Sequence, residues 1–114
     1  MNEIEHIEIP TSDIKGSMEF YSAAFGWKCR EVEGMNYGFF NPEGGPAGGF
    51  DPTAMPGSGI TPYIHVEDIE ATLVKIENLG GSVVTPKTAI GGDMGFFALF
   101  HDPQGNRLGL WSKT

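Results

Sequence analysis

One short pattern of residues occurs twice in this chain of 114 residues, and the repeat restricts what the chain can fold into. Asp13 and Asp68 each follow a short alternating segment and precede a helical pattern, and Asp13 plus 55 is Asp68. The helical patterns stop at Phe25-Gly26 and at Leu79-Gly80, which match at a shift of 54. Two copies of one supersecondary unit, with loops of different length, account for these shifts. A turn that matches at a shift of 61 agrees with this: Asn41-Pro42-Glu43-Gly44 and Asp102-Pro103-Gln104-Gly105.

The first copy contains the signals of a strand, a helix and three more strands. Ile7 and Ile9 alternate with polar neighbours, which is the period of a strand with one buried face. Asp13 or Ser12 can cap the following helix, since a short side-chain oxygen accepts from free backbone N–H groups. Gly26 ends it, as a residue that tolerates positive φ does. The helix carries an apolar stripe, Ile14, Met18, Tyr21 and Phe25, and strands are predicted at 27–32, 35–41 and 47–50.

The second copy repeats this order, with a strand at 63–66, a cap at Asp68 and a stop at Gly80-Gly81. Its helical stripe is Ile69, Leu73, Ile76 and Leu79, and strands follow at 82–85, 95–100 and 107–111. We therefore predict an α+β fold of two βαβββ modules: module one at 1–50, a linker at 51–60 and module two at 61–114. Each helix must cover one face of its sheet with its apolar side, which leaves the other face free.

Composition excludes several function classes. The formal charge is −8 with only seven Lys and Arg residues, so we expect no nucleic-acid partner. No apolar run approaches the roughly 20 residues of a membrane-spanning helix, so we expect no membrane association. The acidic start of the sequence differs from a secretory signal, and the single cysteine, Cys29, excludes an internal disulfide. We expect a cytoplasmic location and a structural role for Cys29.

Four segments together give the chain a family resemblance: His6…Asp13…Phe20-Tyr21…Phe25-Gly26, Tyr63…Val66-Glu67-Asp68, Leu79-Gly80-Gly81 and Asp102-Pro103-Gln104-Gly105-Asn106. In their order and duplication they resemble the vicinal oxygen chelate superfamily, also called the glyoxalase/bleomycin-resistance/extradiol-dioxygenase group. Within it the chain is similar to the small members related to lactoylglutathione lyase. The resemblance implies a half-open, mixed-sheet barrel around a ligand cavity, and a homodimer. Many members hold a divalent metal that chelates neighbouring substrate oxygens, whereas others are metal-free binding proteins.

The resemblance also implies where metal ligands would lie, on the first and last strands of each module. Those positions are His6 and Thr61 on the first strands, and Gly48 and Gly109 on the last strands. Only His6 can coordinate through its side chain, and an ion with one or two protein ligands is weakly held. We therefore expect no metal cofactor. A rearranged site made from His6, Glu8 and His65 remains the alternative.

The period-two rule predicts the ligand-binding face. We expect it to present His6, Glu8, Phe50, Tyr63, His65, Arg107 and Trp111. Aromatic walls with a few polar groups suit a small-molecule pocket. Each residue also has an ordinary structural interpretation: Trp111 can seal a barrel end or a dimer contact, Tyr63 can be a strand aromatic, and Arg107 can be a solvated charge. An inward Glu8 needs a partner, for which Arg107 or His65 would serve.

Two functional hypotheses follow. The first is a small-molecule-binding protein with a degenerate metal site that acts without metal, in the manner of the drug-resistance members. The second is a metal-dependent glyoxalase-related lyase, isomerase or dioxygenase that acts on a small oxygen-rich substrate. In a third case Glu8 and a histidine, with His6 the first candidate, act as a general base without metal.

Overall fold

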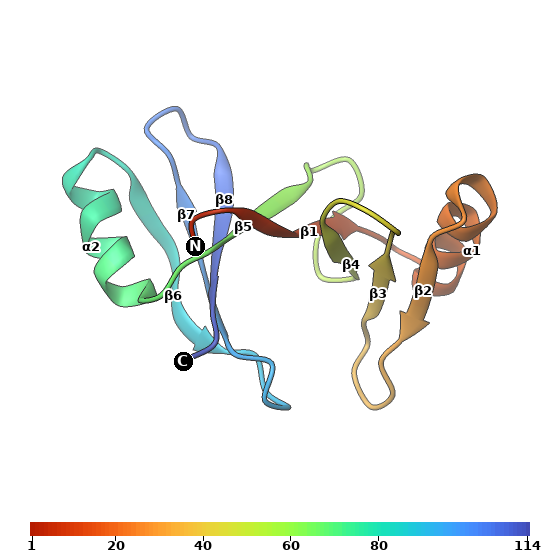
Figure 1. Ribbon diagram of the computed structural model, residues 1–114. Coiled ribbons are helices and arrows are strands. Elements are labelled where there is room, and N and C mark those ends of the chain that lie inside the picture. The colour runs from red at the N-terminus through yellow and green to blue at the C-terminus, as the bar shows by residue number, and fades with distance from the viewer. The chain divides into compact units, whose positions relative to one another are not determined.

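The computed structural model describes residues 1–114 and contains two helices and eight strands (Figure 1). In chain order they are β1 (Ile4–Pro10), α1 (Ile14–Phe25), β2 (Lys28–Glu31), β3 (Gly38–Asn41), β4 (Ala47–Asp51), β5 (Thr61–His65), α2 (Ile69–Asn78), β6 (Ser82–Ala89), β7 (Phe96–His101) and β8 (Arg107–Ser112). The predicted α+β class and the two βαβββ modules are confirmed. Neither helix is long and apolar enough to span a membrane.

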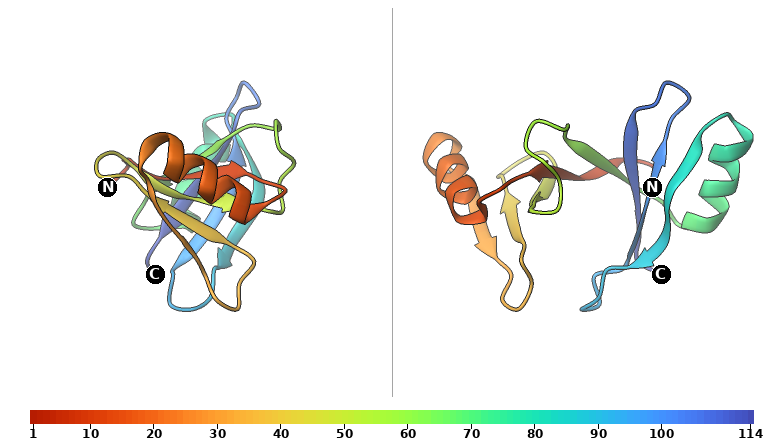
Figure 2. Two further views of the ribbon diagram at one scale, coloured as in Figure 1. Left: turned by 90° about the vertical axis from the view of Figure 1, so that its right-hand side faces the viewer. Right: turned by 180° about the vertical axis from the view of Figure 1, so that it is seen from behind.

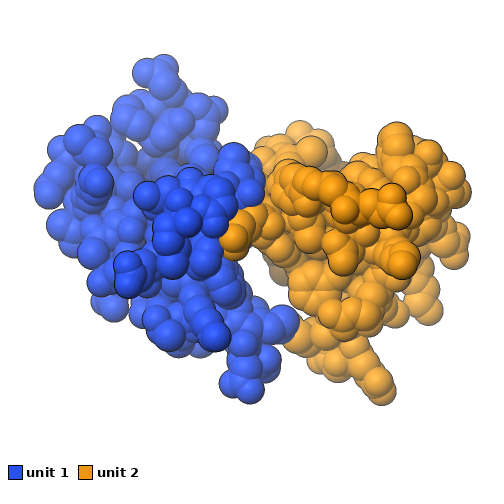
Figure 3. Space-filling model, viewed as in Figure 1, with its two compact units in different colours: residues 1–4, 62–114 blue, residues 5–61 orange.

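The chain divides into two compact units, coloured separately in Figure 3. Unit 2, residues 5–61, holds the first module. Its strands lie in the order β2-β3-β4-β1, with β1 and β4 parallel and the other neighbours antiparallel. Unit 1, residues 1–4 and 62–114, holds the second module in the order β5-β8-β7-β6, again with its first and last strands parallel. Each module therefore pairs the beginning of its sequence with its end.

Each helix covers one face of its own sheet, as Figures 1 and 2 show for α1 beside β2–β4 and for α2 beside β6–β8. Under α2 the core is mostly aliphatic and well buried, and consists of Val66, Ile69, Leu73, Ala98, Phe100 and Leu110. Under α1 it is aromatic. Tyr21 stacks on Trp27 with ring centroids 5.0 Å apart, Trp27 stacks on Phe40 at 4.7 Å, and Phe40 meets Phe50 at 5.3 Å. The apolar faces of both sheets are thus occupied, which leaves the opposite faces for function.

The predicted helix ends are confirmed. Asp13 Oδ1 accepts from the Gly16 amide at 3.1 Å, and Asp68 Oδ1 accepts from the Ala71 amide at 3.0 Å. Gly26 follows α1 with φ 71° and donates its N–H to the Ser22 carbonyl at 2.9 Å. This left-handed conformation suits glycine, which has no side chain to clash.

The internal repeat is visible in the hydrogen bonds between the modules' first and last strands. The Thr11 amide donates to the Asp51 carbonyl at 3.0 Å, and the Val66 amide donates to the Trp111 carbonyl at 2.9 Å. Thr11 and Val66 match at a shift of 55 in the numbering, whereas Asp51 and Trp111 match at a shift of 60, so the last strands correspond at a shift of 60. Gly45 and Gly105, which match at the same shift, have similar left-handed φ values of 84° and 86°. The turn of module one therefore contains one more residue than its sequence motif suggests.

Candidate polar site on the open face of module one

Three polar side chains meet on the face of the module-one sheet that α1 leaves open. His6 and Glu8 project from β1, and Tyr37 comes from the segment just before β3. His6 Nε2 lies 2.7 Å from Glu8 Oε2 and 3.1 Å from the Tyr37 hydroxyl. Tyr37 donates a hydrogen bond to the same Glu8 oxygen. We refer to these three residues as the polar cluster; its histidine and glutamate side chains are 30% and 15% exposed.

The arrangement indicates where the hydrogens lie. An ionised carboxylate only accepts hydrogen bonds, and the Tyr37 hydroxyl donates its one hydrogen to Glu8. Both atoms facing His6 Nε2 are therefore acceptors, so Nε2 carries a hydrogen and donates. Glu8 Oε2 thus receives two hydrogen bonds, and both protein donors use the same carboxylate oxygen.

Gly49 allows Tyr37 to lie where it does. Glu8 and Gly49 are register partners on β1 and β4, and Phe39 is the partner of Gly49 on β3, so all three share one face. A Cβ at Gly49 would overlap the Tyr37 hydroxyl and lie 2.7 Å from Glu8 Oε2. The missing side chain is therefore the space that the phenol occupies.

Phe39 extends this face away from the cluster. Its ring meets the Tyr37 ring edge-on with centroids 4.9 Å apart, and the Arg30 guanidinium lies 5.2 Å from the Phe39 centroid. The open face thus carries one carboxylate, two aromatic rings and, on the far side of Phe39, a positive charge. This mixture is typical of small-molecule sites.

Module two has a different surface at the equivalent positions. Tyr63 corresponds to Glu8, and its register partner is Gly109. A Cβ at Gly109 would overlap the edge of the Tyr63 ring and lie 2.8 Å from its Cγ. An aromatic ring therefore covers the glycine here, where a hydrogen-bonded phenol and carboxylate cover it in module one.

The remaining predicted residues of module two divide into two groups. His65 and Trp111 are register partners, and their ring centroids are 5.1 Å apart. The Trp111 indole donates to the Met94 carbonyl at 2.9 Å. His65 Nδ1 lies 3.7 Å from the Glu3 carboxylate. Both rings are thus held by protein contacts. Arg107 is exposed at the start of β8. His65 and Trp111 stay together with Tyr63 on one face, as the period-two rule predicts.

Two predicted placements are wrong. Phe50 was expected on the open face, but it is fully buried against Phe40 and Tyr21 under α1. Gly48 was expected at the ligand position, but a Cβ there would overlap the Ile7 carbonyl and lie 2.5 Å from the Phe40 ring, on the covered face. Both errors have one cause: the extra residue in the turn shifts β4 by one position, and a shift of one exchanges the two faces of a strand.

Tyr37 and Phe39 were not predicted as site residues. The consecutive glycines Gly48 and Gly49 of β4 could have indicated them. Each leaves one face of the strand without a side chain, and side chains from neighbouring segments must fill that space.

The residues at the family's metal positions do not fit a metal. With the corrected register these positions are His6, Gly49, Thr61 and Gly109. Each glycine's side-chain space is filled by a tyrosine, Thr61 is 4% exposed and a poor ligand, and His6 Nε2 faces two hydrogen-bond acceptors. A firmly held zinc ion uses at least three protein ligands, and histidine binds through a nitrogen without hydrogen.

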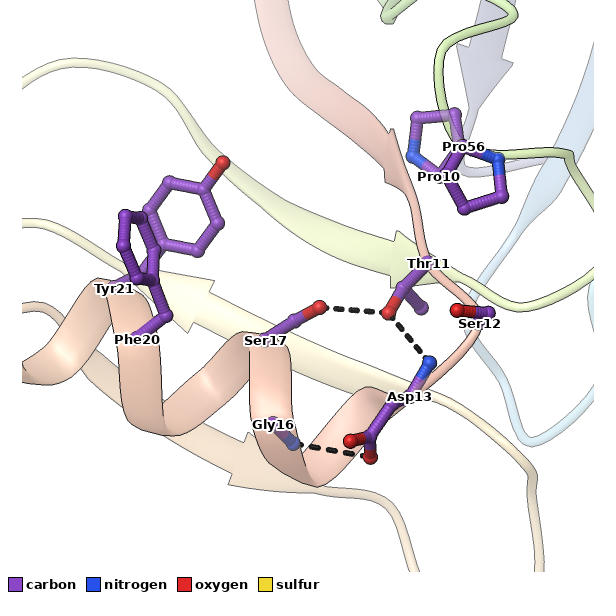
Figure 4. Close-up of a pocket in the computed structure, with 9 residues that line it drawn as sticks. All are labelled: Pro10, Thr11, Ser12, Asp13, Gly16, Ser17, Phe20, Tyr21 and Pro56. Atoms are coloured by element: carbon purple, nitrogen blue, oxygen red, sulfur yellow. Dashed lines mark hydrogen bonds between the residues drawn. The ribbon is translucent and has the colours of Figure 1, made fainter.

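A hollow of about 310 Å³ lies at the start of α1 (Figure 4). Its polar groups bind one another: the Thr11 and Ser17 hydroxyls are 2.6 Å apart, and the Asp13 amide donates to Thr11 Oγ1 at 3.0 Å. Asp13 is itself the helix cap. This hollow is accounted for by the capping of α1 and needs no ligand.

The class of protein follows from these observations: a paired βαβββ protein of the glyoxalase type, with an open polar face on module one. Residues 3–110 match the family described as the Glyoxalase/Bleomycin resistance protein/Dioxygenase superfamily, and the chain belongs to that superfamily.

Relatives agree with this assignment. A "Glyoxylase-like domain-containing protein" of Didymella fabae is 30% identical over 97% of this chain and 94% of its own length. "Putative glyoxylase CFP32" of Mycobacterium bovis is 30% identical over 95% of this chain but only 44% of its own length. "Anthracycline biosynthesis protein DnrV" of Streptomyces peucetius is 28% identical over 93% and 45%. The chain thus spans less than half of the latter two relatives.

Solved structures show the same fold. Hypothetical protein BH1468 from Bacillus halodurans aligns with a TM-score of 0.72 at 17% identity, covering 99% of this chain and 95% of that chain. Methylmalonyl-CoA epimerase from Mycobacterium tuberculosis aligns with a TM-score of 0.70 at 16% identity, covering 96% and 86%. At these identities the likeness concerns the fold alone.

Proposed function

We propose that this protein binds a small organic molecule without a metal ion, and that the polar cluster on module one supplies the polar contacts. The observation that carries the proposal is the engagement of His6 Nε2 with Glu8 and Tyr37, together with Gly49 and Gly109 at positions where metal-dependent members often carry a carboxylate. The name of one relative, an anthracycline biosynthesis protein, supports an organic ligand. On module two, considered by itself, Tyr63, His65 and Trp111 remain proposed ligand-binding residues.

The runner-up is a metal-dependent lyase, isomerase or dioxygenase, which the names of the glyoxylase-like relatives favour. Native mass spectrometry separates the two. Untagged protein is purified without chelator and measured alone and after addition of Zn²⁺, Ni²⁺, Mn²⁺ or Fe²⁺. The proposal expects bare protein or a co-purified organic mass in each case.

A stoichiometric metal that survives dilution and disappears in His6→Ala would contradict the proposal and favour the enzyme. The same spectra test the predicted homodimer, since they give the mass of the assembly directly.

A further inference from the structure

The polar cluster leaves one carboxylate oxygen for a ligand. Both hydrogen bonds of Glu8, from His6 and from Tyr37, end on Oε2. Glu8 Oε1 receives neither of them, although the side chain is only 15% exposed. A carboxylate oxygen in a partly buried site is stabilised by a hydrogen-bond donor, and here that donor is water or a ligand.

The neighbouring side chains restrict the ligand's shape. Phe39, Gly49 and Glu8 lie in one row across three adjacent strands, so Phe39 and Glu8 are separated by two strand spacings, about 9.5 Å. Between them lies Gly49, which has no projecting side chain, and the Tyr37 ring covers it. A flat molecule of one or two rings fits such a surface and gains contact with both aromatic side chains.

The charges on either side restrict the ligand's charge. An anionic group beside Glu8 would be repelled by the carboxylate, and a cationic group over Phe39 would meet Arg30, 5.2 Å from that ring. A neutral donor satisfies Glu8 without either cost.

From these contacts we infer that the site recognises a neutral, planar aromatic molecule through a hydroxyl group that donates to Glu8 Oε1. Tyr37 is then a positioning residue, because it fixes Oε2 and so directs Oε1 toward the ligand. This inference rests on the proposed function and names the ligand class of the same site.

Three naphthalenes of matched size test it: 2-naphthol, 2-methoxynaphthalene and 2-naphthoate. Each is titrated into ¹⁵N-labelled protein, and the affinity is taken from the backbone amide shifts of Glu8 and Gly49. The naphthol should bind about tenfold or more tightly than either of the others, because a hydrogen bond to a charged group is worth that much. The methoxy compound keeps the rings but lacks the donor, so the comparison isolates the hydrogen bond.

Two variants assign the preference to its atoms. In Glu8→Gln the amide oxygen can accept from Tyr37, which places the NH₂ group where Oε1 was; the preference for naphthol should vanish or turn toward naphthoate. Tyr37→Phe keeps the ring over Gly49 but removes the hydrogen bond that fixes Glu8. This variant should reduce the preference for naphthol several-fold without abolishing binding. Spectral dispersion shows whether each variant is folded, and either variant alone suffices.

The failures are distinguishable. Equal binding of naphthol and its methyl ether, or a preference unchanged in both variants, overturns the role of Glu8 while the proposed binding function stands. No binding of any naphthalene overturns the ligand class, and the native mass spectra then decide the proposed function separately.

Discussion

The two modules have the same order of elements but line their last-strand glycines differently. In module one a phenol and a carboxylate meet over Gly49 and bind a histidine, whereas in module two the ring of Tyr63 lies over Gly109. The positions correspond, since each glycine pairs with the equivalent residue of a first strand that precedes a helix cap. The difference teaches that one βαβββ frame accepts either a hydrogen-bonded polar cluster or a single aromatic ring at this position, because a central glycine leaves the space for either.

The largest expected effect tests where Phe50 belongs. Phe50 and Leu110, its equivalent in module two, are both fully buried. Phe50→Ala and Leu110→Ala should lower the free energy of unfolding by about 3–5 and about 2–5 kcal/mol respectively, because each leaves a cavity. Urea unfolding measures both losses. A Phe50 variant of nearly unchanged stability would return this residue to the open face and contradict the corrected register.

The next effect concerns the glycines themselves. Gly49→Ala should displace Tyr37, and Gly109→Ala should displace Tyr63, at a cost of about 1–3 kcal/mol of unfolding free energy each. Gly44→Ala is the matched control, because a Cβ there meets nothing within 4 Å; it should change stability by less than about 0.5 kcal/mol.

A double variant sharpens this test. Gly49→Ala combined with Tyr37→Ala should cost less than the sum of the two single variants, because the clash disappears with the phenol. Strict additivity would show that Tyr37 does not lie over Gly49.

The helix caps offer a smaller effect that should be equal in the two modules. Asp13→Ala and Asp68→Ala each remove an acceptor for a free backbone amide, so each should lower the unfolding free energy by about 1 kcal/mol. Ser12→Ala is the control beside the first cap, and should have little effect. A large loss in Ser12→Ala would mean that Ser12, rather than Asp13, caps α1.

The smallest effect is the pH dependence of one turn. The side-chain amide of Asn106 donates to Asp102 Oδ2 at 3.0 Å, and this bond, with backbone N–H groups of Asn106 and Gln104, lowers the pKa of the Asp102 carboxyl below its ordinary value. A depressed folded-state pKa gives stability that is present above the ordinary aspartate range and is lost as the pH falls through the lowered value. Module one has Asn41 at the matching place in its motif, which does not titrate.

Carbon-13 NMR titration of the Asp102 carboxyl measures this directly. In Asn106→Ala the pKa should move up toward the ordinary aspartate value, because the side-chain donor is lost. An unchanged titration curve would show that the side-chain amide of Asn106 does not bind Asp102 in solution.

The sequence was sufficient for the order of elements because local signals set it: Asp13 and Asp68 cap helices, Gly26 ends one, and alternation marks the strands. Strand lengths were less predictable. β6 runs from Ser82 to Ala89, beyond the predicted 82–85, and includes Pro86; a proline is tolerated at a sheet edge, where no neighbouring strand needs its missing N–H.

The site was predicted only in part. His6 and Glu8 were placed correctly on one face because their spacing is fixed within a single strand. The partner of Glu8 was predicted wrongly, since its hydrogen bonds come from His6 and Tyr37 and not from Arg107 or His65. Tyr37 and Gly49 reach the cluster through pairing between strands, which depends on the turn at Gly45, and one extra residue there exchanged the faces assigned to Gly48 and Phe50. Local periodicity carries no information about such a shift.

The most direct test of the central claim observes His6 itself. Long-range ¹H–¹⁵N NMR of the His6 ring, recorded before and after one equivalent of Zn²⁺, reports the state of Nε2. We predict a hydrogen on Nε2, as its two acceptors Glu8 and Tyr37 require, and no change on addition of the metal. Loss of that hydrogen with a shift of the Nε2 signal at one equivalent would show that His6 is a metal ligand and would contradict metal-independent recognition.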